Sequence, residues 1–401
     1  MTMTTTALRS TDPDLLLDPE THAAGDPHAA WTWMRAHAPV HWHEPGEYPG
    51  FWSVTRYADV REVYRDARRF SSAHGVLLRP RASGPDPGAG QTLALTDPPR
   101  HQHLRALIAD WFSTRSVRLL EAPIDQTVHT LIEHTAGIGD CDFVHDLAGR
   151  LSLYVICDII GIPASGWEEM FQWTNEAFEA EDPLARALAH QRVMEAFADL
   201  MYQRMEHPAD DLISALANGA PGGGLLSEQE IILNCENLLG ATENGRLALI
   251  GAMLAFFDHP GQWRRLREDP GLMGTAIEEI LRWTSSATHS MRTATEPADL
   301  HDRKIEAGDR VVLWLPSANR DEEVFGDPFR FDIGRNPNRH LALGSGVHVC
   351  IGGTLARTQL RVLLSALLEP ALRIEQRGPA VRVASIAVNG AASLPVRIGA
   401  A

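Results

Sequence analysis

Apolar residues recur every three or four positions along most of the chain and alternate in only a few short stretches. The longest helical pattern predicts one helix from Glu228 to His259. Shorter ones predict helices over residues 28–37, 58–70, 142–160 and 167–178, and another just after Cys350. Short strands are predicted at Val40 to His43, Phe51 to Val54 and Val311 to Trp314. Together these patterns indicate a mainly α-helical protein with small β-sheets.

No stretch of the 401 residues has the composition of an interdomain linker. We therefore expect a flexible N-terminal segment at residues 1–26 and a single domain from 27 to 401. The 44% of hydrophobic residues can form a substantial core. No apolar run approaches the roughly 18 residues that a membrane helix needs, and the polar opening lacks the apolar region of a secretory signal. We expect a cytoplasmic protein without a membrane partner.

Charge and cysteine content exclude several classes of site. The formal charge of −16 argues against nucleic acid as a partner, because phosphate binding needs a basic surface. The cysteines at 141, 157, 235 and 350 have no CxxC spacing, so neither a zinc site nor a disulfide framework is indicated. Among the 36 basic residues only Lys304 is a lysine, which suggests a GC-rich genome such as that of an actinobacterium.

The clearest chemical signal is the stretch N-R-H-L-A-L-G-S-G-V-H-V-C-I-G-G-T-L-A-R at Asn338 to Arg357. Its glycines at 344, 346, 352 and 353 allow the backbone to approach a flat macrocycle closely. Cys350 precedes a predicted helix, whose N-terminus favours a thiolate. A lone cysteine is more often a buried structural thiol. The whole pattern instead favours Cys350 as an axial ligand of heme iron.

The run L-G-S-G-V-H-V-C-I-G resembles the heme-binding signature of the cytochrome P450 superfamily, and the resemblance extends from about residue 27 to 398. It implies the P450 fold, a single prism-like α+β domain with heme between the long central helix and the cysteine-loop helix. A hairpin at Ile386 to Leu394 would end near the pocket. The implied cofactor is heme b, iron protoporphyrin IX, with Cys350 as its metal ligand. Leu343 stands where relatives usually have an aromatic residue.

The segment T-D-P-P-R-H-Q-H-L-R places His101 and Arg105 on one helix face. Without context they are an ordinary exposed pair, but the run resembles the family segment that binds heme propionates. The resemblance assigns the same role to Arg292 and His348. The remaining residues expected around the heme are Leu343, Gly344, Gly346, Gly352 and Ala241.

The central helix carries Asn237, Gly240, Ala241 and Asn244 on one face, either as a helix-packing groove or as the wall of a pocket. Gly240 to Glu243 resembles the first half of the family's oxygen-activation motif, but Asn244 replaces the alcohol that helps to deliver protons to dioxygen. A side-chain amide forms hydrogen bonds but is a poor proton relay. The expected catalytic residues are therefore Cys350, Thr242, Glu243 and Asn244, with Glu243 and ordered water supplying protons.

Residues 71–90 are either an ordinary surface loop or, by resemblance, the segment that covers the substrate. In the second interpretation its apolar patch contacts the ligand. The expected substrate contacts are Val76, Leu77, Leu78, Asn237, Gly240, Ala241, Ala287, Thr288, His289, Val388 and Asn389.

Glu279 and Arg282 form an E-x-x-R pair that is either exposed or, with Arg330 of P-F-R-F, the family's buried Glu-Arg-Arg cluster. A second group of arginines surrounds the cysteine segment. These side chains either form a solvated basic face or suit an acidic ferredoxin. They are Arg335, Arg339, Arg357 and Arg361.

We therefore expect a heme-thiolate monooxygenase or oxidase that uses dioxygen and electrons from a separate ferredoxin and ferredoxin reductase. Its reaction would be hydroxylation or epoxidation of a small or medium organic substrate in specialised metabolism. The alternative, suggested by Asn244, is oxidative C–C or C–N bond formation without oxygen insertion. A more remote one is a heme-thiolate protein that binds a ligand without turning it over.

Overall fold

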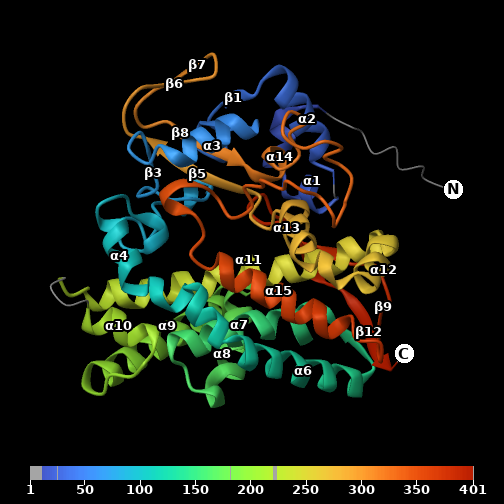
Figure 1. Cartoon of the computed structure of the whole chain (residues 1–401). Coiled ribbons are helices and arrows are strands. Elements are labelled where there is room, and N and C mark those ends of the chain that lie inside the picture. The colour runs from blue at the N-terminus through green and yellow to red at the C-terminus, as the bar shows by residue number, and fades with distance from the viewer. Residues whose placement is uncertain (1–10, 25, 181, 220–223, 401) are drawn as a thin grey trace.

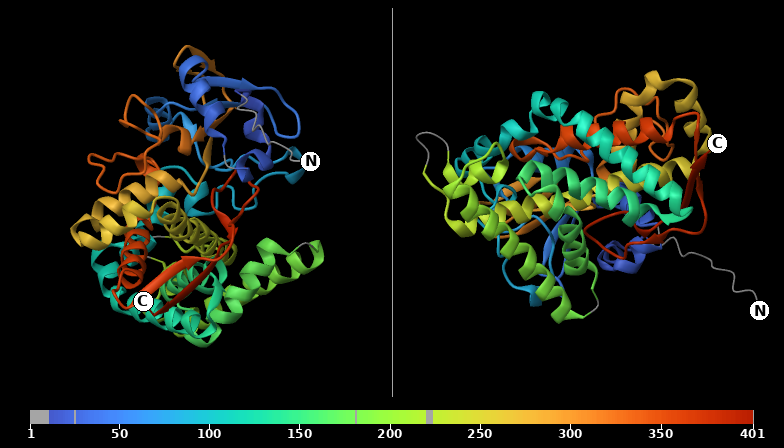
Figure 2. Two further views of the ribbon diagram at one scale, coloured as in Figure 1. Left: turned by 90° about the vertical axis from the view of Figure 1, so that its right-hand side faces the viewer. Right: turned by 90° about the horizontal axis from the view of Figure 1, so that it is seen from below.

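The computed structural model describes residues 11–24, 26–180, 182–219 and 224–400. Long helices form one part of the molecule, at the bottom of Figure 1, and the largest sheet lies in the other part, at the top. The helix α11 (Glu228–Asp258) runs through the helical part. The helices α8 (Trp167–Glu179) and α9 (Pro183–Glu206) project from it side by side (Figure 2).

A capping box starts α11. The Ser227 hydroxyl accepts from the N–H of Glu230, and the Glu230 carboxylate accepts from the N–H of Ser227. The largest apolar core surrounds this helix. The other helices of this part are α4 (Arg100–Ile108), α5 (Thr114–Leu119), α6 (Glu121–Ile138), α7 (Arg150–Ile160), α10 (Leu212–Asn218), α12 (Pro260–Glu268), α13 (Met273–Thr284) and α15 (Gly353–Leu367).

The largest sheet has five strands in the order β1-β2-β8-β5-β3. Of its neighbouring pairs, β2 and β8 are parallel and the others are antiparallel. Near the sheet lie α1 (Pro19–Ala23), α2 (His28–His37), α3 (Tyr57–Arg65) and α14 (Leu315–Ala318) (Figure 1). The sheet's strands are β1 (Val40–His43), β2 (Phe51–Val54), β3 (Phe70–Ser71), β5 (His289–Ala294) and β8 (Arg310–Trp314).

Three smaller sheets complete the described part of the fold. Strand β12 lies between β4 and β9, and the pairs β10–β11 and β6–β7 are two-stranded. The β10–β11 pair carries the expected hairpin, with residues 383–390 between its strands. The bounds are β4 (Asp140–Asp142), β6 (Ala298–Leu300), β7 (Arg303–Ile305), β9 (Leu372–Gln376), β10 (Val381–Arg382), β11 (Ala391–Ser393) and β12 (Pro395–Ala400).

Three expectations about element boundaries were wrong. The helix predicted over 142–160 is α-helical only from Arg150, because Asp142 belongs to β4 and Phe143–Gly149 form a π-helix. The helix predicted over 58–70 ends at Arg65, because the Asp66 carboxylate accepts from the N–H of Arg69 and turns the chain into β3. The segment predicted to be flexible contains a 3₁₀ helix at Pro13–Leu17 and α1, and Leu16 is fully buried. Residues 1–10 and 25 of that segment lie outside the described residues.

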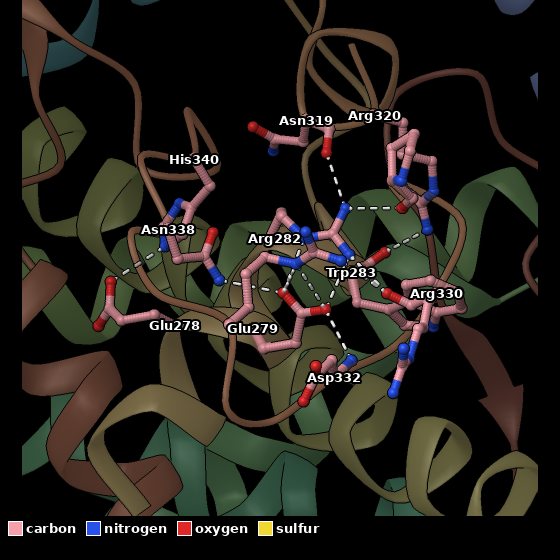
Figure 3. A network of polar contacts seen from close by, with 12 residues as sticks. Glu278, Glu279, Arg282, Trp283, Asn319, Arg320, Arg330, Asp332, Asn338 and His340 are labelled. Atoms are coloured by element: carbon pink, nitrogen blue, oxygen red, sulfur yellow. Dashed lines mark hydrogen bonds and ion pairs between the residues drawn. The ribbon is translucent and has the colours of Figure 1, made fainter. Parts of the chain in front are cut away.

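Glu279 of α13 is the centre of a buried polar cluster (Figure 3). Arg282 Nε lies 2.7 Å from Glu279 Oε2, and Arg335 Nε lies 3.1 Å from the same oxygen. Asn338 and the N–H of Asp332 also donate to this carboxylate. The Glu-Arg-Arg cluster is therefore present, and it holds the chain that leads into the cysteine loop against α13.

The prediction that Arg330 supplies the second guanidinium of this cluster was wrong. Arg330 is exposed, and only its carbonyl takes part, accepting from Arg282 and Arg335. Arg335 takes the predicted place because the turn at 327–335 folds its side chain back over the carbonyls of Gly326 and Asp327.

Candidate active site

Cys350 lies in the loop before α15 and opens into a cavity of about 380 Å³ between that loop and α11. Its N–H donates to the carbonyl of Leu343, 2.9 Å away. Burial raises the pKa of the thiol, whereas a hydrogen bond from the Gly352 backbone and the charges of Arg105 and Arg357 act in the opposite direction. Because Cys350 opens into the cavity, its sulfur is placed to coordinate a metal bound there, which would displace the thiol proton.

Backbone geometry explains one glycine of this loop. Gly346 has φ of 73°, and a Cβ there would lie 2.5 Å from the carbonyl oxygen of Tyr64. Glycine is therefore required at 346 because α3 packs against the loop. Close approach of a macrocycle is not needed to explain this residue.

Four polar side chains lie at or behind one side of the cavity: Arg292 and His348 line it, whereas His101 and Arg105 do not. His101 Nδ1 and His348 Nε2 are buried without a hydrogen-bond partner, and the two rings lie 4.1 Å apart. Arg292 is buried over the Tyr64 ring, and among the described residues no carboxylate lies within ion-pair distance of its guanidinium. Arg105 donates to the carbonyl of Val349. These donors all suit an anion.

The two histidines remain neutral at ordinary pH. Burial is the main cause that lowers the pKa of His348 to about 3, with contributions from Arg292, His101 and Arg105. Burial, followed by the charge of Arg105, also lowers the pKa of His101. The positive charge on this side of the cavity therefore belongs to Arg292, which lines it, and to Arg105 behind the lining, and the histidines contribute neutral N–H donors. This donor set fits the two carboxylates of a heme, and the Cys350 thiol fits its iron.

Helix α11 forms the opposite wall. Ala241 is exposed to the cavity, and Asn244 also lines it, with an Oδ1 atom that is buried and unpartnered. Thr242 lines the cavity, but its hydroxyl donates to the carbonyl of Leu239 at 2.6 Å. Glu243 lies outside the lining, and its Oε1 pairs with Arg246 at 2.8 Å. Of the residues expected to handle protons, Thr242 and Asn244 therefore line the cavity, whereas Glu243 lies outside the lining in an ion pair with Arg246.

Comparison with known proteins agrees with this geometry. The family model described as Cytochrome P450 matches residues 191–370. The cytochrome P450 NovI of Streptomyces niveus is 36% identical over 389 residues, which are 96% of each chain. The chain belongs to the cytochrome P450 family.

Solved structures of relatives cover almost the whole fold. P450 OxyD, involved in the biosynthesis of vancomycin-type antibiotics, has a TM-score of 0.89 at 32% identity, covering 96% of this chain and 99% of its own. The hydroxylase HmtN, involved in himastatin biosynthesis, has a TM-score of 0.82 at 26% identity, covering 95% and 99%. This protein is therefore a P450 monooxygenase with a heme held by the Cys350 thiolate.

The P450 cavity contains several of the expected substrate contacts. Val76, Leu77, Ala287 and His289 line it, as do Leu343 and Gly344 of the cysteine loop. Two hydrogen bonds fix the covering segment to β5. The carbonyl of Val76 accepts from the N–H of Met291, and the N–H of Leu78 donates to His289 Nε2.

Other expected contacts lie elsewhere. Leu78 is buried in a separate apolar cluster beneath the segment. Asn237 and Gly240 are not among the lining residues, because the cavity side of α11 carries Leu238, Ala241, Thr242, Gly245 and Ala248 and each residue turns the helix by about 100°.

The terminal hairpin also differs from expectation. Val388 pairs with Ala287 outside the lining, and Asn389 Nδ2 donates to the carbonyl of Thr284. Thr288 and Asn389 line a second cavity on the other side of this segment. Thr288 and Asn389 therefore have no direct place beside the heme.

Sequence reasoning missed the polar residues that α7 and α15 contribute. Ser152 and Gln359 both line the P450 cavity beside Gly245, and the Ser152 hydroxyl is buried without a partner. A Cβ at Gly245 would lie 3.5 Å from Ser152 Oγ and 3.7 Å from Gln359 Oε1. Nothing in the apolar patterns of α7 and α15 marks these two residues, because their meeting depends on tertiary packing.

None of the helices in the described part of the chain combines the length and apolarity needed to cross a membrane.

Proposed function

We propose that this P450 inserts one atom of dioxygen into a C–H or C=C bond of a small or medium organic substrate, as a tailoring step in specialised metabolism. The observation that carries the proposal is the Cys350 thiol opening into a largely apolar cavity under α11. The relatives support the metabolic context. HmtN is described as a post-tailoring hydroxylase and OxyD as involved in antibiotic biosynthesis.

In this proposal the residues around the cavity have different roles. Bound heme would supply the redox chemistry that activates dioxygen. His101, Arg105, Arg292 and His348 would hold its carboxylates and so orient it. Leu238, Ala248 and Leu281 exclude water from the apolar part of the cavity. Asn244 offers an amide N–H₂ to an acceptor and its free Oδ1 to a hydroxyl or water.

The proposal is tested by product analysis. The holoenzyme is supplied with surrogate redox partners and with compounds that displace water from the ferric heme, as detected by absorption. Overall, substrate, dioxygen, two electrons and two protons give oxygenated product and water. A product heavier by one oxygen atom, labelled when ¹⁸O₂ is used, is expected.

Oxidative C–C or C–N bond formation is the second candidate, and Asn244, which lines the cavity in place of the family's usual alcohol, favours it. In that reaction the substrate loses two hydrogens, both oxygen atoms leave as water, and a ring or dimer forms without a gain of oxygen. The same ¹⁸O₂ experiment separates the two. A dehydrogenated product without label would support coupling and contradict oxygen insertion.

Electrons are proposed to come from a separate ferredoxin and its reductase. The basic face that was expected around the cysteine segment is partly neutralised, since Arg335 pairs with Glu279, Arg357 with Glu278 and Arg361 with Glu121. Arg339 is exposed, and among the described residues no carboxylate lies within ion-pair distance of it. If a ferredoxin docks here, Arg339→Glu should slow heme reduction several-fold at low salt, and high salt should reduce the difference.

A further inference from the structure

A second cavity, of about 210 Å³, lies between α2, the C-terminal end of α11, and the segment that joins α13 to β5. Thr284 lines both this cavity and the heme cavity, so one segment separates them. Ser286, Ala287 and His289 of that segment line the heme side, whereas Thr288 lines the other. The P450 reaction as described above uses no residue that faces only the second cavity.

The wall of this cavity contains buried polar atoms that have no hydrogen-bond partner. They come from α2, from the end of α13 and the segment after it, and from the turn after α14, so distant parts of the sequence supply them. A buried polar atom left unpaired loses its hydrogen bond to water without replacement, which indicates that a polar ligand satisfies these atoms. The atoms are His28 Nδ1, Trp31 Nε1, Thr284 Oγ1, Thr288 Oγ1 and Arg320 Nε.

Arg320 makes this wall positive. Its guanidinium lies 4.7 Å from the ring of Trp283, and Nη2 donates to the Trp283 carbonyl (Figure 3). Among the described residues no carboxylate lies within ion-pair distance of it. The acidic residue of the lining, Asp258, is exposed, as is the basic residue Arg382. A buried cation without a counter-ion is costly, and a bound anion removes that cost.

The charge of Arg320 persists at neutral pH. Burial, together with Arg282 and Arg35, lowers the pKa of Arg320 to about 9. Burial also holds the pKa of His28 well below its usual value, with Arg320 acting in the same direction. His28 is therefore neutral, and Arg320 is the buried cation that faces the cavity.

The beginning of α2 adds a third observation. Pro27 and His28, at the N-terminus of this ten-residue helix, line the cavity, and the N-cap makes no side-chain hydrogen bond. The N-terminal end of a helix favours negative charge. Unpaired donors, an unpaired cation and an uncapped helix N-terminus thus point to the same class of ligand.

We propose that this cavity is a second ligand site, which binds a small carboxylate through Arg320, Trp31 and Thr288. Arg320 Nε and Trp31 Nε1 donate to the carboxylate oxygens, and the Thr288 hydroxyl donates a further hydrogen bond. The ligand lies behind the segment 284–289, on the side away from the heme, so it stabilises that segment without occupying the substrate cavity. This proposal does not depend on the reaction proposed above.

The test uses the heme-loaded full chain and formate as the probe. Calorimetric titration of formate should give saturable binding to one site. Trp31→Phe and Thr288→Val keep the shape of the wall, and each should weaken binding about tenfold. Trp33→Phe, on the same helix but outside the lining, should leave binding unchanged. Arg320→Gln should abolish it.

Crystals soaked in bromide show where an anion binds. An anomalous peak within hydrogen-bonding distance of Arg320 Nε is expected. The proposal is overturned if formate binding is not saturable, if Trp31→Phe and Thr288→Val bind formate as the parent does, or if the cavity holds only ordered water in the soaked crystals. The Trp31 and Thr288 variants decide the matter if Arg320→Gln does not fold, because Arg320 also bonds the Trp283 carbonyl.

Discussion

The Glu279 cluster and the heme cavity both bury charged side chains, but their hydrogen bonding differs. In the cluster, Glu279 receives bonds from Arg282, Arg335 and Asn338, and Arg282 donates in addition to backbone carbonyls. At the cavity wall, Arg292 has no carboxylate partner among the described residues, and His348 Nε2 has no partner. Asn338 Oδ1 is an exception within the cluster, because it is buried without a partner. The comparison teaches that buried charges with full pairing, such as Glu279 and Arg282, are structural, whereas a buried charge without a counter-ion beside a cavity identifies the place of a ligand.

The largest effect is expected when the cavity loses its metal ligand. Cys350→Ala should abolish turnover and remove the shifted Soret band of the reduced carbon monoxide complex, because the other groups of the wall bind carboxylates and cannot replace a thiolate. Cys235→Ala, in the buried core of α11, is the control and should keep the band. A thiolate-type spectrum in the Cys350 variant would contradict the assignment.

Disrupting the Glu279 cluster should lower the stability of the fold and should not change the chemistry at the heme. Glu279→Gln leaves Arg282 and Arg335 buried without their counter-ion, and we expect a loss of roughly 3–5 kcal/mol in the free energy of unfolding. Denaturant titration measures it. The matched control is Arg330→Ala, whose exposed side chain lies outside the cluster, and its effect should stay within about 0.5 kcal/mol. Equal effects of the two substitutions would contradict the assignment of Arg335.

Replacing Arg292 tests the incomplete network directly. Arg292→Gln removes the buried cation from the cavity wall and should speed transfer of heme to an apo-globin acceptor about 10–100-fold, the effect of one charge-assisted hydrogen bond. Arg310→Gln, on the neighbouring strand β8 and outside the cavity, serves as the control. Stability of the heme-free protein should change little in both variants. Unchanged heme transfer would remove Arg292 from the proposed propionate set.

A smaller change is expected from Asn244→Thr, which restores an alcohol at this position of α11. If Asn244 limits proton delivery, the variant should release several-fold less hydrogen peroxide per electron pair consumed, because hydroxyl groups relay protons and amides do not. Peroxide and product are measured together. Unchanged turnover and leakage would leave the proton-delivery argument without support.

The smallest expected effect is on the pH dependence of folding stability, through His43 in the largest sheet. Burial is the main cause that lowers the pKa of His43 to about 4, whereas the unfolded value is about 6.5. The unfolded chain therefore takes up the proton first, and stability falls as the pH decreases from about 6.5 to 4. His43→Gln should flatten this part of the stability profile, measured by denaturation at several pH values. His37→Gln, at an exposed position, should not.

Local patterns were sufficient for most elements of the fold. The helix at 28–37 and the strands at 40–43 and 51–54 have the predicted bounds, and the helix predicted from Glu228 ends one residue early. Two of the failures have a single side chain as their cause. Asp66 ends α3 through its hydrogen bond to the N–H of Arg69, and the spacing of apolar residues gives no sign of that bond. Arg335 replaces Arg330 because the turn between them decides which guanidinium points inward.

The site was harder to predict, because it depends on which face of each element meets another. The Cys350 loop could be recognised from its glycines and the helix that follows. The side of α11 that faces the cavity could not be predicted from the sequence, so Asn237 and Gly240 were expected to line a cavity that they do not line. Thr288 and Asn389 were assigned to the heme pocket although they line a different cavity together with Arg320. The positions of Ser152 and Gln359 could not be predicted, because they depend on how α7, α11 and α15 pack together.

The two hydrogen bonds that fix Val76 and Leu78 to β5 have an evolutionary consequence. They hold the main chain on both sides of Leu77, and the side chains of Val76 and Leu77 still line the cavity. Substitution at 76 or 77 therefore reshapes the cavity without displacing the backbone. A duplicated gene could acquire a new substrate through one or two such changes while the heme environment and the fold stay as they are.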